Sequence, residues 1–249
     1  MQKITQKRIK EIVKLKQKKY RKQFKKVVVN GERIVNQIID NGVWPEEIYL
    51  TCAEDAHIYY EKKLQNVFEV SAQQMRRISN NETPQKVSAL FRIVPVKIKS
   101  RKKLLYLDKI NDPGNLGTIL RTAISADFDG VILSSDCVDP FNQKVINASM
   151  GAVFSFPFEV MTADELLSLP NQKIVTCLEN AENIYEFKPE KSFVLIIGSE
   201  ARGISESLIK NSDKRITVPM TGKMESLNVA VAAGIAMSYL NYKSRENDF

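Results

Sequence analysis

Three short runs of consecutive apolar residues constrain the fold most. They are LLYL at 104–107, VIL at 131–133 and FVLIIG at 193–198. Each run has the length of a strand and is too short for a buried helix. Runs without alternating polar residues are typical of a parallel sheet that is covered on both faces. Because segments of helical length separate them, we predict an α/β domain with a parallel sheet over residues 104–249.

The other predicted elements also alternate between strand and helix. In this domain we expect strands at 104–107, 131–133, 174–177, 194–197 and 216–218, with helices at 116–126, 143–150, 205–210 and 227–242. In a separate small α/β domain over residues 1–95 we expect strands at 24–29, 48–51, 67–70 and 87–94, with helices at 5–19, 32–40, 53–66 and 72–78. Residues 96–103 carry five basic side chains and no helical period, so they are predicted to be a linker.

The positive charge is concentrated at the N-terminus. The chain has a net charge of +8, yet residues 1–26 alone hold 12 Lys and Arg against one acid, and the remaining 25 bases and 28 acids give −3. Such a block attracts a polyanion, of which nucleic acid is the first candidate. An anionic membrane surface is the alternative, but the segment lacks a continuous apolar face and any Trp. A solvated helix that only aids solubility is the plainest interpretation. The predicted RNA contacts are Lys18, Lys19, Arg21, Lys22 and Lys25.

Several functional classes are disfavoured by residues that the sequence lacks. His57 is the only histidine, which argues against a Ser-His-Asp mechanism and a multi-histidine metal site. Cys52, Cys137 and Cys177 lie far apart, so neither a disulfide framework nor a zinc knuckle is expected. The sequence contains no run of about 18 apolar residues, so no membrane-spanning helix is predicted. Residues 1–26 lack the apolar core of a secretory signal. We therefore expect a cytoplasmic protein without a metal.

The first loop with chemical potential follows the strand at 104–107. Residues 108–117 read DKINDPGNLG, and Pro113, Gly114 and Gly117 predict a tight turn into a helix. Asn115 is expected to cap that helix. Arg121 follows on its second turn among apolar neighbours, so its guanidinium needs an anionic partner, either within the protein or in a ligand.

Two further loops follow later strands. After 194–197 the sequence reads GSEARGIS, in which Gly198 and Gly203 would let backbone approach a ligand and Glu200 places an acid at the strand end. After 216–218 the chain passes Pro219 and reaches Ser226 and Asn228, which open the last helix. Ligands of parallel sheets bind at the carboxyl ends of strands, so the three loops are predicted to form one site.

The order and spacing of these motifs resemble a known family. NxGxxxRTA at 115–123, GxEARGIS at 198–205 and VPMxGxxxSLNVAVAAGIA at 218–236 are similar to the SpoU/TrmH-type RNA ribose 2′-O-methyltransferases of the SPOUT superfamily. The resemblance covers residues 104–243. Residues 1–95 more loosely resemble the family's L30e-like substrate-binding domain, through Phe24 to Gly31 and Asn81-Glu82-Thr83-Pro84-Gln85. Lys86 stands where relatives commonly have glycine, and Ala201 replaces a glycine of many relatives.

The resemblance implies a deep trefoil knot in the C-terminal part of the sheet and a bound S-adenosylmethionine. It also implies a homodimer that packs through the last helix and the helix of the first motif, where Ala230 to Ala236 offer a small-residue face. The cofactor-binding residues that it implies are Thr176, Gly198, Val218, Met220, Ser226 and Leu227. The catalytic residues that it implies are Arg121, Asn115, Glu200, Ser226 and Asn228, with Arg121 also contacting RNA.

These roles imply a particular chemistry. A guanidinium stays protonated at neutral pH, so Arg121 would hold a phosphate and stabilise the developing alkoxide rather than act as a base. The other polar residues would orient Arg121 and the ribose. The two-domain layout favours ribosomal RNA over tRNA by analogy.

Two alternatives remain. A dinucleotide-dependent oxidoreductase is disfavoured because no strand precedes G-x-G-x-x-G. A non-catalytic RNA-binding or ribosome-assembly protein would use the basic segment and the L30e-like domain, but would not need the polar set at 115, 121, 200, 226 and 228.

Overall fold

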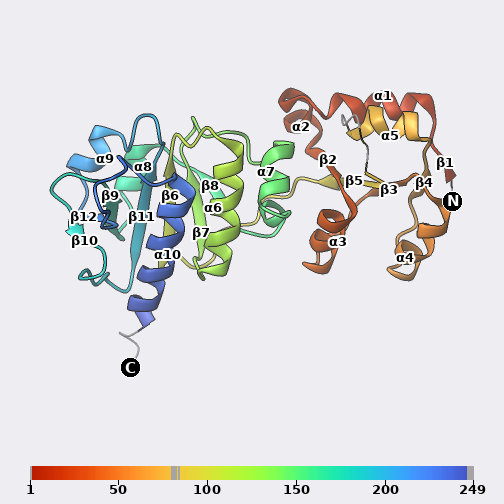
Figure 1. Cartoon of the computed structure of the whole chain (residues 1–249). Coiled ribbons are helices and arrows are strands. Elements are labelled where there is room, and N and C mark those ends of the chain that lie inside the picture. Colours follow the sequence, from red (N-terminus) through yellow and green to blue (C-terminus); the bar gives the residue numbers. More distant parts are fainter. Residues whose placement is uncertain (1, 80–82, 84, 246–249) are drawn as a thin grey trace. The chain divides into compact units, whose positions relative to one another are not determined.

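The computed structural model describes residues 2–79, 83 and 85–245, and the chain divides into two compact units (Figure 1). Unit 1 is Met1–Val94 and unit 2 is Pro95–Phe249. Each unit has its own sheet. Asn81, Glu82 and Pro84 of the predicted loop motif at 81–85 lie outside the described residues.

Unit 1 contains a five-stranded mixed sheet in the order β1-β4-β3-β5-β2. The strands are β1 (Gln2–Lys3), β2 (Lys26–Asn30), β3 (Glu47–Leu50), β4 (Val67–Glu69) and β5 (Val87–Arg92). The strands β2 and β3 both pair antiparallel with β5, whereas β4 is parallel to β1 and β3.

Helices cover both faces of this sheet, as Figure 1 shows. They are α1 (Gln6–Lys14), α2 (Lys18–Phe24), α3 (Glu32–Asp40), the 3-10 turn η1 (Ala53–Asp55), α4 (Ala56–Glu61) and α5 (Ala72–Ser79). The core beneath α1 and α5 contains Ile9, Ile12 and Met75 against Tyr49 and Leu90 of the sheet. Of the three elements predicted before residue 43, the helix at 32–40 is confirmed with both bounds, whereas the strand and the first helix need adjustment.

The predicted single helix from Thr5 to Lys19 is wrong, because the chain turns between α1 and α2. Thr5 does cap α1, accepting a hydrogen bond from the Arg8 N–H. The Arg21 guanidinium then donates to the carbonyls of Leu15 (3.2 Å) and Lys16 (2.7 Å), which stabilises the turn. The next strand consequently begins at Lys26, later than predicted, after Lys25 adopts a left-handed φ of 50°.

Unit 2 contains a seven-stranded sheet in the order β10-β12-β9-β11-β6-β7-β8, and every neighbouring pair is parallel. The strands are β6 (Lys103–Asp108), β7 (Gly130–Leu133), β8 (Phe158–Val160), β9 (Gln172–Thr176), β10 (Glu182–Asn183), β11 (Phe193–Gly198) and β12 (Lys214–Thr217). The parallel sheet predicted from the apolar runs is confirmed, and β8 and β10 are additional.

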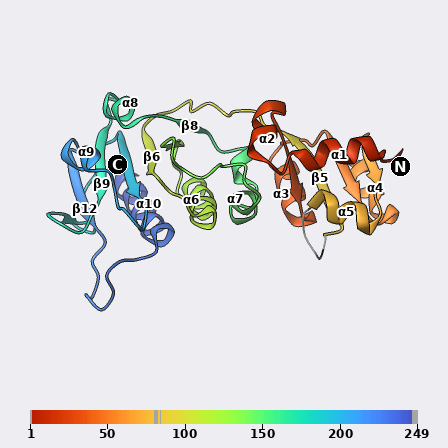
Figure 2. The same cartoon turned by 90° about the horizontal axis from the view of Figure 1, so that it is seen from above.

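Both faces of the unit 2 sheet are covered (Figure 2). The helices are α6 (Pro113–Ser125), α7 (Gln143–Ala148), the 3-10 turn η2 (Ala152–Phe154), α8 (Ala163–Leu167), α9 (Glu206–Lys210) and α10 (Val229–Arg245). Leu104, Tyr106 and Ile196 pack with Leu166 of α8 and Leu208 of α9. The α6 and α10 helices pack against each other on the opposite face.

The first loop differs from its predicted form. Asp112, not Asn115, caps α6, and its carboxylate accepts from the Asn115 N–H at 2.8 Å. Pro113 at the first helical position favours this start, because its missing N–H and fixed φ suit that position. Gly117 therefore lies inside α6, where a Cβ would come within 2.6 Å of the Ala148 Cβ on α7. Its small size serves helix packing rather than the turn.

Part of the predicted linker at 96–103 belongs to the core of unit 2. Ile98 is buried against Gly130 at the start of β7. Arg101 pairs with Glu159 at 2.6 Å, and Lys103 pairs with Asp127 at 2.8 Å.

No helix in the described part of the chain is both long and apolar enough to cross a membrane.

Candidate active site

A cavity of about 490 Å³ lies at the carboxyl ends of β9, β11 and β12 in unit 2. It is bounded by the segments 176–179, 197–204, 215–220 and 226–232. All six residues that the resemblance assigns to the cofactor lie in its wall: Thr176, Gly198, Val218, Met220, Ser226 and Leu227. The second and third predicted loops therefore converge, as the strand-end argument requires.

The loop after β11 is a tight hairpin that only glycine permits at its base. The backbones of Ser199 and Gly203 exchange two hydrogen bonds, of 3.1 and 2.8 Å. A Cβ on Gly198 would lie 2.2 Å from the carbonyl carbon of Gly203, so any side chain there would force the hairpin open. The left-handed φ of the loop, 62°, occurs at Gly203. Ala201 has no positive φ, which explains why its methyl group is tolerated.

A hydrogen-bonded chain of three side chains joins the three loops. The Asn228 Nδ2 donates to the Asn115 Oδ1 at 3.1 Å, and the Asn115 Nδ2 donates to the Glu200 Oε1. In sequence, Asn228 is 113 positions from Asn115, and Asn115 is 85 positions from Glu200. The second carboxylate oxygen of Glu200 accepts no hydrogen bond from a described residue. Because Glu200 lines the cavity, this oxygen is a hydrogen-bond acceptor held at the cavity wall.

Asn228 has a second role at the start of α10. Its Oδ1 accepts from the N–H groups of Ala230 (2.9 Å) and Val231 (3.3 Å), as a helix cap does. The cap fixes the orientation of the side-chain amide, so that its Nδ2 points toward Asn115. Asn228 therefore both caps α10 and begins the hydrogen-bonded chain.

A buried acid beneath the cavity was missed by the sequence reasoning. Asp108 ends β6, is 2% exposed, and lies beside Gly198 in the sheet register. Its Oδ2 accepts from the Ser205 N–H (2.7 Å) and hydroxyl (2.6 Å), and Lys109 Nζ donates to that hydroxyl at 3.0 Å. The available signal was an aspartate directly after the apolar run LLYL, since an unpaired buried charge is costly.

Arg121 is not part of the cavity wall. It is exposed on α6, and its guanidinium has no hydrogen bond or ion pair with any described residue. The expectation that Asn115, Glu200 and Asn228 orient Arg121 is therefore not met within one chain. Of the two anionic partners that the sequence left open for Arg121, the internal one is absent from the described residues. The guanidinium is therefore available to an external anion.

The predicted RNA contacts of unit 1 divide into two groups. Lys18, Lys19, Lys22 and Lys25 are exposed on or next to α2. Arg21 is 8% exposed and donates to backbone carbonyls in the turn before α2. The prediction that Arg21 faces RNA is therefore wrong, because its donors stabilise the fold.

The cavity wall also contains a thiol, that of Cys177. Burial raises the pKa of the Cys177 thiol in the cavity wall, although nearby Arg215 opposes the shift, so the thiol is protonated at neutral pH. Across the described residues, no three His, Cys, Asp or Glu side chains gather as a metal site would need.

Two family models match the chain. The model of the SpoU rRNA Methylase family matches residues 102–238, and that of the MRM3-like substrate binding domain matches residues 6–89. The first match spans the sheet of unit 2 and all three loops, and the second lies within unit 1.

Individual relatives extend over both units. The chain is 31% identical over 237 residues to 23S rRNA (guanosine(2553)-2′-O)-methyltransferase RlmP of Bacillus subtilis, covering 94% of this chain and 95% of the relative. The AdoMet-bound rRNA methyltransferase of Sinorhizobium meliloti superposes with a TM-score of 0.82 at 26% identity, covering 100% of this chain and 98% of that one. The SpoU methyltransferase AviRb of Streptomyces viridochromogenes, at 20% identity and a TM-score of 0.83 over 97% and 98% of the two chains, supports the fold alone.

Proposed function

The chain belongs to the SpoU rRNA methylase family, and from this premise we propose that it transfers a methyl group from S-adenosylmethionine to a ribose 2′-hydroxyl of ribosomal RNA. The observation that carries the proposal is the cavity at the strand ends, bordered by the hydrogen-bonded chain from Asn228 through Asn115 to Glu200.

The residues of the cavity fit the cofactor. A volume of about 490 Å³ lies within the range of small-molecule sites. Ile197, Ile204 and Ile216 offer an apolar surface for an adenine, while Ser199 and Ser226 offer hydroxyls to a polar tail. The similar protein of Sinorhizobium meliloti was crystallised with AdoMet bound. When bound, S-adenosylmethionine supplies a methyl group on a sulfonium, which makes that group electrophilic.

Glu200, Asn115 and Asn228 position the acceptor. The unbonded oxygen of Glu200 can accept a hydrogen bond from the ribose 2′-hydroxyl, which would aim the oxygen at the methyl group. The two asparagines hold that carboxylate in place: Asn115 donates to it, and Asn228, itself fixed by the N–H groups at the start of α10, donates to Asn115. Ser226, in the cavity wall, offers a further hydrogen bond to the nucleotide.

Arg121 binds the RNA backbone and stabilises the charge that develops on the 2′-oxygen. Its permanent charge and its lack of a described partner suit a phosphate ligand. Because Arg121 lies outside the cavity wall of its own chain, the Arg121 of a second chain is available to complete the site. We therefore include in the proposal a homodimer that packs through α6 and α10, whose exposed faces carry Ile124 (41% exposed) and Val231 (51% exposed).

The remaining features of the proposal concern the whole chain. The C-terminal part of the sheet would form a trefoil knot, and residues 1–95 would be an L30e-like substrate-binding domain. Residues 104–249 would be the catalytic domain, with Ile98 of the segment 96–103 packed into its core. The match of 6–89 to a substrate-binding domain supports the second point. The three unpaired cysteines suit a reducing compartment, so the cytoplasm is the proposed location.

The alternative is a non-catalytic RNA-binding protein, and calorimetry with S-adenosylmethionine distinguishes the two. We expect the wild type to bind the cofactor, and Gly198→Ala to weaken binding at least tenfold because the added methyl group collides with Gly203. Gly42→Asn, a change in unit 1 with open space around it, should leave binding unchanged, because asparagine tolerates the left-handed φ of 83° at this position. Absence of binding by the folded wild type would favour the alternative.

A further inference from the structure

Two stacked aromatic rings lie on α2, in the most basic part of the chain. The rings of Tyr20 and Phe24 have centroids 6.2 Å apart and planes inclined by 11°. Tyr20 packs on the core beneath α1 and α5, whereas Phe24 is 48% exposed. The pair is therefore anchored on one side and open to solvent on the other.

The charges around this pair distinguish it from an ordinary exposed aromatic residue, which by itself needs no explanation. Lys14 and Lys19 place their Nζ atoms 5.9 and 5.8 Å from the centroid of Tyr20. Lys22 and Lys25, on either side of Phe24 in sequence, are exposed and have no ion pair with any described residue. Two cations therefore lie over the Tyr20 ring, and two more are exposed within two residues of Phe24 in sequence.

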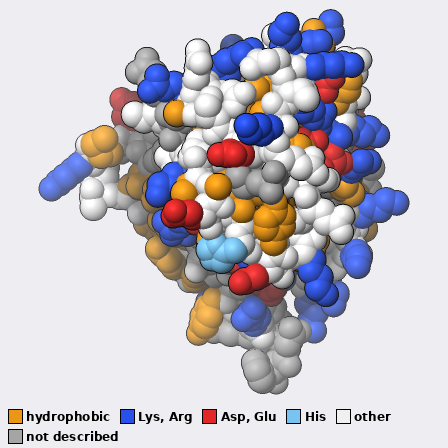
Figure 3. Space-filling view, turned by 90° about the vertical axis from the view of Figure 1, so that its right-hand side faces the viewer, with side chains coloured by type: hydrophobic (Ala, Val, Ile, Leu, Met, Phe, Trp, Pro, Cys, Tyr) orange, Lys and Arg blue, Asp and Glu red, His pale blue; other side chains and the backbone are white. Residues whose placement is uncertain are grey.

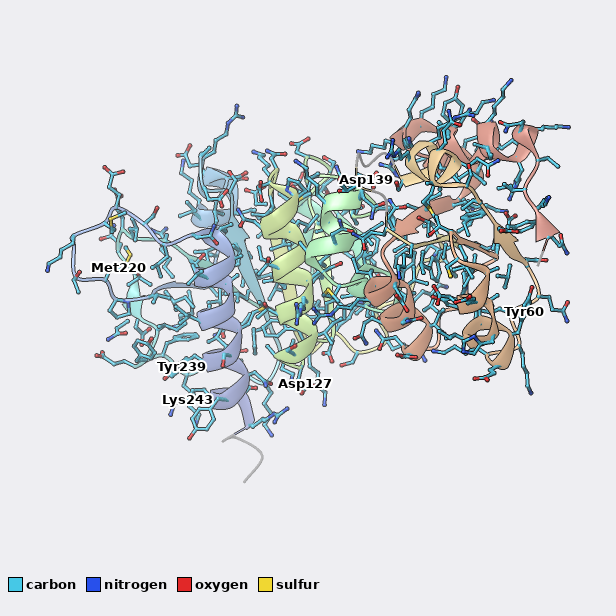
Figure 4. The ribbon with its side chains drawn as sticks, turned by 45° about the vertical axis from the view of Figure 1, so that its right-hand side comes forward. Tyr60, Asp127, Asp139, Met220, Tyr239 and Lys243 are labelled. Carbon is cyan, nitrogen blue, oxygen red and sulfur yellow. The ribbon has the colours of Figure 1, made fainter. Side chains whose placement is uncertain are left out.

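The surrounding surface extends this charge. Lys7 and Lys10 continue the exposed side of α1, and Arg76 and Arg77 lie on the neighbouring α5. Figure 3 shows Lys and Arg side chains gathered along the upper edge of this face of unit 1, and Figure 4 shows many nitrogen-tipped side chains projecting from α1 and α5. The only acid among residues 1–26, Glu11, already pairs with Arg8 at 2.9 Å.

We propose that this α2 surface, made of Tyr20, Phe24, Lys19, Lys22 and Lys25, binds an unpaired nucleotide of the RNA. A base stacks on Phe24, and the lysines contact the phosphates on either side. The inference rests on the proposed RNA substrate and adds that the RNA presents an unstacked base to unit 1.

The combination of aromatic and cationic groups selects this ligand over two others. A duplex offers phosphates to the lysines but keeps its bases stacked, so it gains nothing from Phe24. An anionic membrane would require several apolar anchors along one face. Lysine is the commonest residue at the exposed positions of α1 and α2. Among the described residues of these two helices, Phe24 is the one large apolar side chain that is exposed.

The test compares single-stranded and duplex RNA as ligands of the full chain. We expect Phe24→Leu to weaken binding of a single strand of about 12 nucleotides by about 5- to 100-fold, because one stacked base is lost. Binding of the same strand in a duplex should change less than about twofold. Tyr60→Leu is the matched control: Tyr60 is 43% exposed on α4, away from α1 and α2 in Figure 4, and its loss should alter neither affinity.

A second variant tests stacking directly. Trp44 is the only tryptophan, so Trp44→Phe combined with Phe24→Trp places the sole indole on the surface. We expect single-stranded RNA to quench its fluorescence and duplex RNA to leave it nearly unchanged. This readout also shows that a ring at position 24 is compatible with the fold.

The outcomes separate the surface from the enzyme activity. Equal losses for single strand and duplex, or no loss in Phe24→Leu, would overturn the stacking surface even if the wild type methylates ribosomal RNA. Preference of the wild type for anionic phosphatidylglycerol vesicles over RNA would overturn it as well. Selective loss and selective quenching, in a protein that transfers no methyl group, would support the surface and reject the proposed function.

Discussion

At the scale of single residues, Asp108 positions the loop after β11 without lying in the cavity wall. Its carboxylate holds Ser205, two residues after the end of the Ser199–Gly203 hairpin. We expect Asp108→Asn to weaken S-adenosylmethionine binding about tenfold, since hydrogen bonds to a charged group are lost. The effect should appear mainly in KM for the cofactor rather than in kcat.

Asp129 provides the matched comparison for Asp108. Its Oδ2 accepts from the N–H groups of Lys102 (2.8 Å) and Lys103 (2.9 Å) at the opposite end of β6. Asp129→Asn should lower the melting temperature without changing KM for the cofactor. If both variants raise this KM equally, the role of Asp108 is general stability and not loop position.

Residue identity alone did not decide which polar side chain would serve which purpose. Asp112 and Asn115 are both good cap residues, and the prediction chose Asn115. The structure uses Asp112 as the cap, and this choice frees the Asn115 amide to link Glu200 with Asn228. The partners of Asn115 are 85 and 113 residues distant, so no local pattern could reveal them.

At the scale of elements, the end of α10 is tied to the loop after α6. Asp127 accepts from Lys103 at 2.8 Å and from Arg245 at 3.0 Å, and these hydrogen bonds lower the pKa of its carboxyl group. Asp127 is labelled in Figure 4 near the lower end of α10. Its φ is 56°, so asparagine is the suitable replacement because it tolerates the left-handed region.

We expect Asp127→Asn to lower the melting temperature at pH 7 by about 1–4 °C, as befits a largely exposed ion pair. A lowered carboxyl pKa stabilises the fold above the pKa of the unfolded chain, and this stabilisation is lost as the pH falls through the folded value. The difference between variant and wild type should therefore begin to shrink as the pH falls below about 4 and disappear once the pH is below the folded pKa. Asp136→Asn, an exposed acid without an ion pair to a described residue, should show no such pH-dependent difference.

The strands with a continuous apolar run were predicted well, and several short elements without one were missed. The runs at 104–107, 131–133 and 193–198 correspond to β6, β7 and β11. Strand β8, which has only three residues, was missed. Helix α8 was missed as well, although Thr162 and Glu165 form a capping box at the start of this helix. The turn between α1 and α2 was also missed, because it depends on the tertiary environment of Arg21 rather than on a helix-breaking residue.

At the scale of the whole molecule, the position of Arg121 leads to a prediction about assembly. In a homodimer packed through α6 and α10, Arg121 of one chain would complete the site of the other. Arg121→Ala and Asn228→Ala should each be inactive as homodimers. A mixed dimer of the two, purified by separate tags, should regain about half of the wild-type activity because one of its two sites is intact. No recovery in a mixed dimer of confirmed stoichiometry would show that Arg121 acts within its own chain.

The central claim is that the cavity at the strand ends directs methyl transfer to a ribose oxygen of ribosomal RNA. The most direct measurement incubates the full chain with methyl-labelled S-adenosylmethionine and ribosomal RNA from cells that lack the gene, and then locates the label by nuclease digestion. We expect the label on a 2′-oxygen at a defined nucleotide, and its loss in Asn228→Ala. Label on a base, or a folded protein that transfers no label to ribosomal RNA, would contradict the account.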